Sequence, residues 1–462
     1  MRQPRHEPGA RAAIRAANAA AGRRIVVLDD DPTGSQSMHG VPIVTALDER
    51  EYGFAMAAPS TSFVLTNTRS LPEADAAAVT TEVATSVLRH GEALGVPVRL
   101  VSRSDSTLRG HVVAEVDALR AVRRRVTGRD YRGVLLVPAY FEAGRFTEGD
   151  VHWAMVGGRP VPVGGTEFAR DATFGYSSSD LREFVAERSG GTIAAADVGS
   201  VSLDDIRVGG PERVADILRG VSDGRFVVVN ATDYADLEIV ALGLLSVPDD
   251  FLFRTGPSFV RALSGVDPIG PVTAASIWPG GRPGGHGLVV VGSHVGQTSR
   301  QLAVARERGA LAAVELDAAA VADPDRAPAA VARAAGRVGA ALAGSDVVLF
   351  TSRDLVVGDG RLTSLAISRA VSAGVAEVVA RSLPAGPAWV VAKGGITSHD
   401  VAVRGLGLRR AVVLGQVFPG MVSVFAPVDA APAAMGVPYV VFAGNVGDER
   451  ALADVVDLLA GR

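Results

Sequence analysis

Hydrophobic and polar positions alternate along the chain in two kinds of block. Short runs of β-branched residues are followed by longer stretches in which apolar positions recur with the spacing of an amphipathic helix. In the first half, this pattern predicts strands at residues 25–28, 62–66, 98–102, 134–137 and 226–230, and helices at residues 73–94, 111–124, 179–188 and 212–221. Because strands that alternate with helices build βαβ units, we expect a mostly parallel sheet.

The alternation stops once, where Pro and Gly become dense at residues 270–287, and then restarts. This predicts a linker at 271–287 between a first domain at 24–270 and a second at 288–462, with an N-terminal arm at 1–23. The second domain is predicted to hold strands at 288–291, 312–316, 347–351, 388–392 and 439–442, helices at 298–308, 328–342, 365–383 and 448–459, and a β-rich segment at 410–425. The predicted fold class is α/β, with two domains that each carry a mostly parallel sheet flanked by helices, and an active site in the interdomain cleft.

Composition narrows the class of protein. The chain has 462 residues, of which 48% are hydrophobic and 21% charged, which is typical of a globular protein with more than one core. A formal net charge of −4 does not suggest a nucleic-acid footprint, and no apolar run reaches membrane-spanning length. The absence of cysteine excludes disulfides and thiolate chemistry and suits a reducing cytoplasm, where we expect the protein to act. The Ala- and Arg-rich first 22 residues favour a frayed helix over a transit peptide.

Polar clusters follow the predicted strands of the first domain, at the edge where open α/β sheets bind ligands. Three consecutive carboxylates, Asp29-Asp30-Asp31, come directly after the first strand and need cations or a metal to balance them. Arg69 follows the second strand, residues 102–111 combine cations, a carboxylate and hydroxyls, and a fourth loop ends in Arg145. This mixture suits a small polyhydroxy acid, whose carboxylate an arginine fork would clamp, although helix capping explains any single residue equally well.

Glycine turns between strands and helices distinguish the second domain. They occur at residues 292–298, 393–398 and 443–448, and backbone N–H groups in such turns bind anions. Three of them indicate a polyphosphate such as ATP, although the chain has neither a Walker A nor a Gly-x-Gly-x-x-Gly sequence after a strand. Lys393, the only lysine among 46 Lys and Arg residues, lies in the second turn, where a compact cation suits a phosphate. The pair His399-Asp400 is either a metal or acid–base site or a solvated helix face.

Four motifs together resemble the four-carbon acid sugar kinase family, also called DUF1537. They are Asp-Asp-Pro-Thr-Gly at 30–34, Ser-Asp-Ser-Thr-Leu-Arg-Gly at 104–110, Lys-Gly-Gly-Ile-Thr-Ser at 393–398 and Gly-Gln-Val-Phe-Pro-Gly at 415–420. The match keeps the same order through nearly the whole chain. Two departures lie on the sugar side: Pro32 with Ser35-Gln36 in the first motif, and Arg103 where the family often has lysine.

The resemblance implies a first domain that binds a four-carbon acid sugar and a second that binds ATP. It implies phosphorylation of the terminal hydroxyl of threonate, erythronate or an oxo-tetronate by in-line transfer, with Mg²⁺ on the phosphates. Either Asp31 or Asp105 is the expected catalytic base. The expected substrate-binding residues are Asp30, Arg69, Arg103, Ser104, Arg109 and His111. The expected ATP-binding residues are Ser293, Lys393, Gly394, Gly395, Ile396, Thr397 and Gly444, and the metal ligands stay open.

Two other functions stay open at this point. One is a different ATP-dependent enzyme on the same architecture, such as a ligase, which would release AMP or join two substrates. The other is a non-catalytic sensor that binds a small acid without turning over ATP. The expected partners are the small-molecule acid sugar and a second copy of the chain in a homodimer, with neither nucleic acid nor a membrane.

Overall fold

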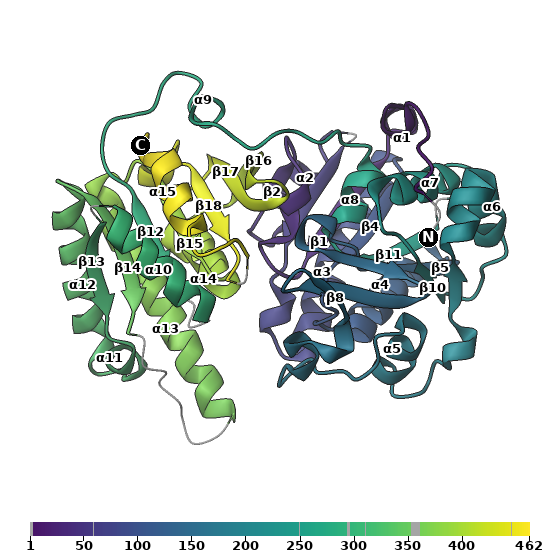
Figure 1. The fold of residues 1–462 in the computed structure, drawn as a ribbon, viewed down its shortest axis with the longest axis horizontal. Helices are drawn as coiled ribbons and strands as arrows, with labels where there is room; N and C mark the ends of the chain where they lie inside the picture. The colour runs from purple at the N-terminus through teal and green to yellow at the C-terminus, as the bar shows by residue number, and fades with distance from the viewer. Residues whose placement is uncertain are drawn as a thin grey trace. The chain divides into compact units, whose positions relative to one another are not determined.

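The chain forms two compact units, residues 1–269 and residues 270–462, called unit 1 and unit 2 below (Figure 1). The structure is a computed structural model that describes residues 3–58, 60–248, 250–292, 296–309, 311–352, 361–444 and 446–462. The predicted α/β class, with mostly parallel sheets flanked by helices in two domains, is confirmed. Among the described residues, no helix combines the length and the apolarity that crossing a membrane requires.

The described strands of the unit 1 sheet are all parallel, in the order β2, β3, β1, β4, β11, β5, β10, β9. Their bounds are Arg24–Asp29 (β1), Pro42–Val44 (β2), Thr61–Leu65 (β3), Val98–Arg103 (β4), Gly133–Val137 (β5), Gly199–Val201 (β9), Arg225–Val229 (β10) and Phe251–Thr255 (β11). Asp29 pairs in register with Leu65 and with Arg103, and Arg103 pairs with Thr255. The carboxyl edge of the sheet therefore gathers polar clusters that are far apart in the sequence.

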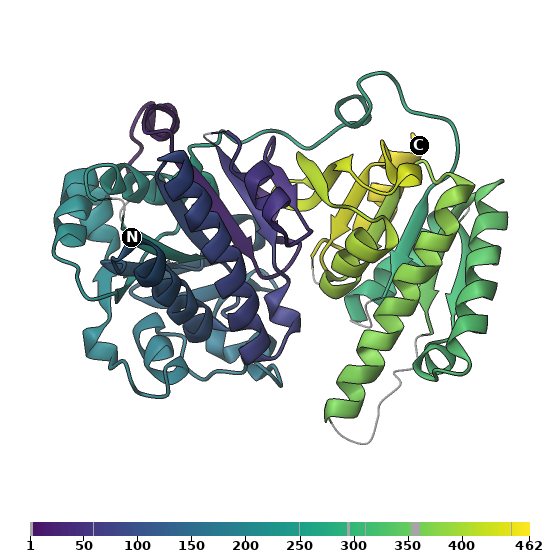
Figure 2. The ribbon, with the colours of Figure 1, turned by 180° about the vertical axis from the view of Figure 1, so that it is seen from behind.

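Helices α3 (Glu73–Leu94) and α4 (Val112–Thr127) pack against each other on the unit 1 sheet. They bury apolar side chains such as Val87 and Leu119 against Leu28 of β1 and its neighbours. Figure 2 shows this helix pair, in dark blue, in front of the sheet. The sequence pattern predicts the observed bounds of α3, because its apolar positions keep helical spacing until Gly95, which adopts the left-handed conformation at the end. The unit also contains α2 (Glu49–Ala55), α5 (Leu181–Arg188) and α6 (Gly210–Arg219).

The predicted N-terminal helix is present as α1 (Ala10–Ala20), but it is docked on unit 1, so the expectation that it is frayed is wrong. It packs on α7 (Tyr234–Leu244) and α8 (Pro257–Ser264), with Ile14 fully buried. Arg11 forms an ion pair with Glu238 at 2.6 Å, and Asn18 Nδ2 donates to the Leu263 carbonyl at 3.0 Å. The arginine-rich composition of this segment hides an amphipathic helix with a packed face.

A small antiparallel sheet was not predicted. It consists of β6 (Arg145–Glu148), β7 (Val151–Val156) and β8 (Arg159–Pro162). His152 on β7 is fully buried, and its Nε2 lies 2.8 Å from the Ser106 carbonyl oxygen, in the loop that follows β4. This contact fixes the small sheet beside the carboxyl edge of the main sheet.

The unit 2 sheet has the order β13, β14, β12, β15, β18, β17, β16. The first five of these strands are parallel, and β17 and β16 continue the sheet in antiparallel fashion. The bounds are Leu288–Val291 (β12), Leu311–Leu316 (β13), Asp346–Thr351 (β14), Val390–Lys393 (β15), Arg410–Phe418 (β16), Met421–Asp429 (β17) and Tyr439–Phe442 (β18). Val291, Lys393 and Phe442 lie side by side at the carboxyl ends of β12, β15 and β18.

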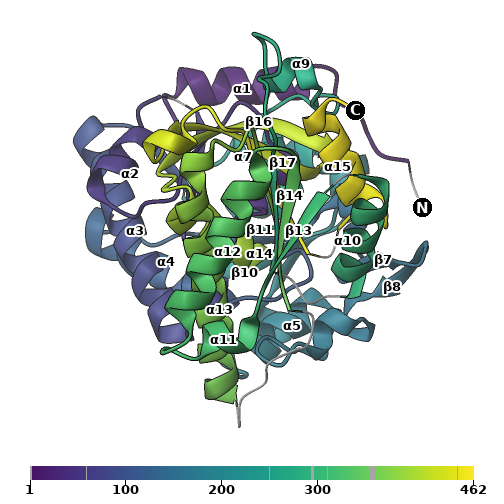
Figure 3. The same cartoon turned by 90° about the vertical axis from the view of Figure 1, so that its left-hand side faces the viewer.

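Two groups of helices enclose this sheet. Figure 3 shows its strands between α12 (Ala327–Leu342) and α13 (Arg361–Ser382) on one side and α10 (Gly296–Arg308) and α15 (Ala451–Ala460) on the other. The shorter α11 (Ala318–Ala322) and α14 (Gly395–Asp400) belong to the same unit. The predicted linker also contributes to it, because α9 (Ala274–Ile277) lies inside the linker, and Ile277 and Trp278 are buried in the unit 2 core.

Candidate functional site

The three consecutive aspartates at the end of β1 are balanced by arginines. Asp29 is fully buried and accepts a hydrogen bond of 2.8 Å from Arg103. Burial raises the pKa of Asp29 to about 7, although the charge of Arg103 opposes the shift. A Cβ on Gly34 would come within 2.1 Å of Asp29 Oδ2, so only glycine fits where this loop passes the carboxyl group.

Arg69 contacts the next two carboxylates. Its Nη2 and Nε donate to the two oxygens of Asp30 at 2.5 and 3.1 Å, and its Nη1 lies 3.4 Å from Asp31 Oδ2. Burial alone would lower the pKa of the Arg69 guanidinium. The nearby negative charges of Asp30 and Asp31 have the larger effect, so the pKa is raised. The sequence predicts that Arg69 and Arg103 bind the substrate. In the structure, both side chains already form ion pairs with carboxylates of the protein. Their contact with a ligand stays a prediction.

Asp31 is more accessible than its two neighbours. Its Oδ1 accepts from the Thr33 backbone N–H at 2.8 Å and from the Thr33 hydroxyl. Burial raises the pKa of Asp31, but Arg69, Arg103 and the Thr33 hydrogen bonds outweigh burial, so the net shift is downward. Asp31 is therefore ionised at neutral pH.

The loop after β4 presents Asp105, whose two oxygens differ. Oδ2 accepts from the Arg109 Nε at 2.6 Å and from the Thr107 hydroxyl, whereas Oδ1 accepts no hydrogen bond from any residue that the structure describes. Burial disfavours its charge, yet Arg109 and Arg69 lower the pKa of Asp105 below its usual range. Gly110 closes this loop at a φ of 122°, and a Cβ there would approach Asp30 Oδ2 to 3.0 Å. The loop thus holds an ionised carboxylate with one free oxygen.

Two predicted substrate residues in this loop are buried. Ser104 is 5% exposed, and its backbone N–H donates to the Thr255 carbonyl at 2.9 Å. His111 is 6% exposed, its Nε2 lies 3.0 Å from the Leu71 carbonyl oxygen, and its ring meets Phe174 edge-on at 5.0 Å. These contacts hold the loop in place.

A buried ion pair beneath the loop was missed. Glu115 of α4 accepts from Arg254 of β11, and Ser102 and Thr68 complete this polar group. Arg254 is 1% exposed, and its Nε and Nη2 have no hydrogen-bond partner among the described residues. No strand is predicted between residue 230 and the linker, so the sequence did not place Arg254 in the sheet. The available signal was the apolar run Phe251–Phe253 ahead of Gly256-Pro257.

In unit 2 the predicted nucleotide residues surround the carboxyl ends of β15 and β18. Gly394 has a φ of 115°, which only glycine adopts readily, and its N–H donates to the Phe442 carbonyl at 2.8 Å. Gly395, Ile396 and Thr397 open the short helix α14, and Ile396 is 54% exposed. Ser293 lies outside the described residues.

The segment around Gly444 is held by α10. Thr298 Oγ1 donates to the Gly444 carbonyl at 3.1 Å, and Gln301 Nε2 donates to the carbonyls of Val446 and Asp448 at 3.1 and 2.6 Å. A Cβ on Gly292 would come within 2.3 Å of Thr397 Oγ1, so the end of β12 touches the start of α14. Three chain segments of the predicted nucleotide site are therefore in contact.

Lys393 is fully buried under these turns. Its Nζ donates to the Ala443 carbonyl at 2.9 Å and lies 3.8 Å from the centroid of the Phe442 ring. Burial lowers the pKa of the amine to about 7. Lys393 ends β15 and its amine binds Ala443, which follows β18, so the lysine connects the ends of these two strands. A direct contact between Lys393 and a phosphate stays a prediction that this side-chain position does not support.

Asp400 accepts a hydrogen bond from Ser372. Across the part of the chain that the structure describes, no group of three or more metal-ligating side chains comes together.

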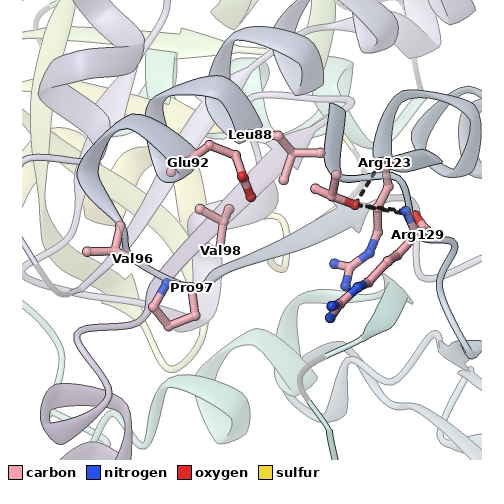
Figure 4. Close-up of a pocket in the computed structure, with 9 residues that line it drawn as sticks. Leu88, Glu92, Val96, Pro97, Val98, Arg123 and Arg129 are labelled. Atoms are coloured by element: carbon pink, nitrogen blue, oxygen red, sulfur yellow. Dashed lines mark hydrogen bonds between the residues drawn. The ribbon is translucent and has the colours of Figure 1, made fainter. Parts of the chain in front are cut away.

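A separate cavity of about 370 Å³ in unit 1, shown in Figure 4, lies at the amino end of β4 and is lined by Val98, Arg123 and Arg129 among others. It is distant from Arg103 at the other end of that strand. In its wall, Arg123 stacks on Tyr131, with the guanidinium carbon 4.4 Å from the ring centre.

Comparison with protein families assigns the two units. Residues 25–263 match the model of a sugar-binding N-terminal domain, and residues 288–452 match the model of a nucleotide-binding C-terminal domain. The chain belongs to the four-carbon acid sugar kinase family. This membership agrees with the resemblance found in the sequence motifs. No curated protein sequence matches the chain.

Two solved structures similar to this chain have TM-scores above 0.5 and share its fold. A Salmonella typhimurium LT2 protein, whose name proposes a tRNA synthase, is 18% identical, with a TM-score of 0.67 over 94% of this chain and 98% of its own. Haemophilus influenzae protein HI1011, a DUF1537 protein, is 16% identical, with a TM-score of 0.60 over 94% and 99%. A DUF1537 protein from Bordetella bronchiseptica, a domain-swapped dimer with bound citrate, is 22% identical over 96% and 99%, with a TM-score of 0.40.

Proposed function

We propose that the protein is an ATP-dependent kinase that phosphorylates the terminal hydroxyl of a four-carbon acid sugar, such as threonate, erythronate or an oxo-tetronate. The observation that carries this proposal is the state of Asp105 in the sugar-binding unit. Its carboxylate is ionised, and Oδ1 is free of hydrogen bonds from the described residues. Such an oxygen can accept a hydrogen bond from the acceptor hydroxyl and orient it for attack.

Asp105 is the better of the two candidate bases. Asp31 is also ionised, but both of its oxygens face protein groups: Thr33 takes Oδ1, and Arg69 lies near Oδ2. We therefore assign Asp105 to the acceptor hydroxyl and Asp31 to the positioning of Arg69. As the new bond between oxygen and phosphorus forms and the bond to the leaving ADP breaks, the hydroxyl proton passes to Asp105. In this type of transfer, positioning supplies most of the catalysis.

The nucleotide is assigned to unit 2, a nucleotide-binding domain by family. Gly394, Gly395 and Thr397 lie at the start of α14, where backbone N–H groups point away from the helix. Gly444 is held beside them by α10. Magnesium enters the proposal as part of the nucleotide substrate, since Mg²⁺ is commonly held by phosphates and water with one or two carboxylates.

Phosphorus NMR of the reaction products tests this function. The protein is incubated with Mg²⁺ and ATP and, in turn, with D-erythronate, L-threonate and their oxo forms. We expect ADP and one new phosphomonoester with at least one of these acids. Release of AMP would instead favour a ligase-like reaction, which the name of the Salmonella typhimurium protein also brings to mind. Binding of an acid without any ATP consumption would make the protein a sensor.

A further inference from the structure

Arginines at the carboxyl edge of the unit 1 sheet fall into two classes. In the described part of the chain, four of them lie within ion-pair distance of a protein carboxylate, and Arg145 does not. The four paired arginines are Arg69 (with Asp30), Arg103 (with Asp29), Arg109 (with Asp105) and Arg254 (with Glu115). Among the described residues, Arg145 therefore has no carboxylate within ion-pair distance.

Arg145 lies close to Arg109. It begins β6, where its backbone exchanges two hydrogen bonds of 2.9 and 3.0 Å with Tyr140. Its guanidinium carbon lies 5.8 Å from the centre of the Phe168 ring, and that of Arg109 lies 5.3 Å from the same centre. The Arg145 Nε is buried and has no hydrogen-bond partner among the described residues. Two guanidinium groups therefore share one aromatic ring beside Asp105.

The electrostatics of these two arginines differ. Burial lowers the pKa of Arg145, and the attraction of Asp105 does not reverse the shift. Burial also disfavours the charge of Arg109, but its hydrogen-bonded partner Asp105 outweighs burial and raises its pKa. A half-buried guanidinium without a counter-ion is costly, and an anion bound to it would remove that cost.

The surrounding chain is built to hold this arrangement. His152 of β7 contacts the Ser106 carbonyl at 2.8 Å, and the Tyr176 hydroxyl donates to the Thr107 carbonyl at 2.8 Å. Both side chains are buried, and burial lowers the pKa of His152 to about 4, so it is neutral at pH 7. The His152 contact fastens the small sheet that carries Arg145 to the loop that carries Asp105, and the Tyr176 bond fastens the segment before α5 to the same loop. The distance between the two functional groups is therefore fixed by the fold.

We propose that Arg145, together with Arg109, binds the carboxylate of the four-carbon acid sugar and so makes the site specific for sugar acids over neutral sugars. The inference rests on the proposed function, because it assigns one end of the substrate to Arg145 and the other end to Asp105. A planar guanidinium matches a carboxylate with two parallel hydrogen bonds. The negative charge of Asp105 does not oppose this binding strongly, since Arg109 pairs with it and the Thr107 hydroxyl donates a hydrogen bond to it. Arg69 and Arg103 then act within the protein, where they form ion pairs with the three aspartates.

The test compares Arg145→Gln and Arg145→Lys with Arg159→Gln, a matched control on the exposed end of the same small sheet. Steady-state rates are measured with D-erythronate, L-threonate and neutral erythritol, and ATP is varied separately. We expect Arg145→Gln to raise the KM for the acid at least about tenfold, with the KM for ATP and the rate with erythritol unchanged. Arg145→Lys should restore part of the loss, because it keeps the charge but not the fork. The control should behave like the parent protein.

Thermal shift with the same acids separates this inference from the proposed function. If the parent protein is stabilised by erythronate or threonate but does not phosphorylate them, the kinase proposal fails. The inference then stands only if Arg145→Gln abolishes that stabilisation. Equal loss of activity with acid and neutral sugars would mean a structural role for Arg145, and a selective rise in the KM for ATP would mean a phosphate contact. Either result would overturn the inference, as would the absence of any shift with the parent protein.

Discussion

The two units place their candidate sites at the same position in the fold, the carboxyl ends of parallel strands, but they build them from different groups. Unit 1 concentrates charged side chains there: Asp29, Asp30 and Asp105 are paired with arginines within a few residues of three strands. Unit 2 uses backbone turns, in which Gly394 and Gly444 are held by hydrogen bonds between carbonyls and neighbouring groups. The comparison teaches that the sheet edge provides only the location, and that each loop decides which kind of ligand is recognised.

The two kinds of site also differ in their energetic cost. Buried ion pairs are expensive to assemble, and removing one partner leaves a buried charge that costs about 3–5 kcal/mol. Backbone turns carry no net charge and need only space for a glycine. We therefore expect unit 1 to respond most strongly to charge changes and unit 2 to changes of side-chain volume.

The largest expected effect is that of Asp105→Asn. The amide cannot take a proton from the acceptor hydroxyl, so kcat for the acid sugar should fall about 100- to 10,000-fold. Nucleotide binding, measured by calorimetry with a non-hydrolysable ATP analogue, should not change, because Asp105 belongs to unit 1. Asp171→Asn is the matched control, since Asp171 lies 3.6 Å from the same Arg109 but has no assigned role. Full activity of Asp105→Asn would remove Asp105 from the chemistry.

The next effect concerns the buried pair of Glu115 and Arg254. Glu115→Gln leaves the 1%-exposed Arg254 without its counter-ion, so the free energy of unfolding should fall by about 3–5 kcal/mol. Urea denaturation followed by fluorescence measures the change. Removing the exposed pair of Glu377 and Arg381 in unit 2 by Glu377→Gln should cost less than about 1 kcal/mol. Equal costs for the two variants would contradict the contrast between the units.

The sequence places the candidate residues of unit 1 at the strand ends, but it does not give most of their partners. Asp105 and Arg109 lie in one short segment, so their mutual contact follows from local spacing. The use of Arg69 and Arg103 by the three aspartates could not be predicted, because it depends on the order of β3, β1 and β4 in the sheet. Arg254 was missed because no strand was predicted at residues 251–255, and its place beside Glu115 also depends on β11 entering the sheet between β4 and β5.

The sequence also predicts most helices and strands, with α3 and β12 at their observed bounds. The regular spacing of their apolar residues makes these elements predictable from the sequence. The strands β6, β7 and β8 have short and mixed patterns, and their position depends on contacts such as His152 with Ser106. Lys393 stands out in the sequence as the only lysine, but only the fold shows that its amine is buried against Phe442.

A change of volume tests unit 2. In Gly292→Ala, the new Cβ would lie 2.3 Å from Thr397 Oγ1, so the start of α14 must move. We expect the affinity for an ATP analogue to fall about 10- to 100-fold, as measured by calorimetry, without a change in acid-sugar binding. Gly336→Ala in α12 is the control, because nothing lies within 4 Å of its added Cβ. If both variants bind nucleotide equally well, the contact between β12 and α14 does not support the site.

Lys393 is the exception to the contrast, a buried charge in the unit that otherwise uses backbone groups. Its pKa is lowered to about 7 from an ordinary value of 10.5, so the unfolded chain binds a proton that the folded chain has released between these two pH values. Stability should therefore rise with pH across this window, by up to about 1.4 kcal/mol per pH unit, and the slope should disappear in Lys393→Met.

Because the chain has one lysine, uniform labelling with ¹³C-lysine gives a single side-chain signal, whose titration midpoint reports this pKa directly. A midpoint near 7 that moves when an ATP analogue binds would mean that the lysine supports the nucleotide turns through Ala443. A midpoint near 10.5 would mean that the amine reaches solvent and is available to a phosphate as a point charge. In that case unit 2 would use a charged side chain as unit 1 does, and the contrast between the two sites would be one of degree.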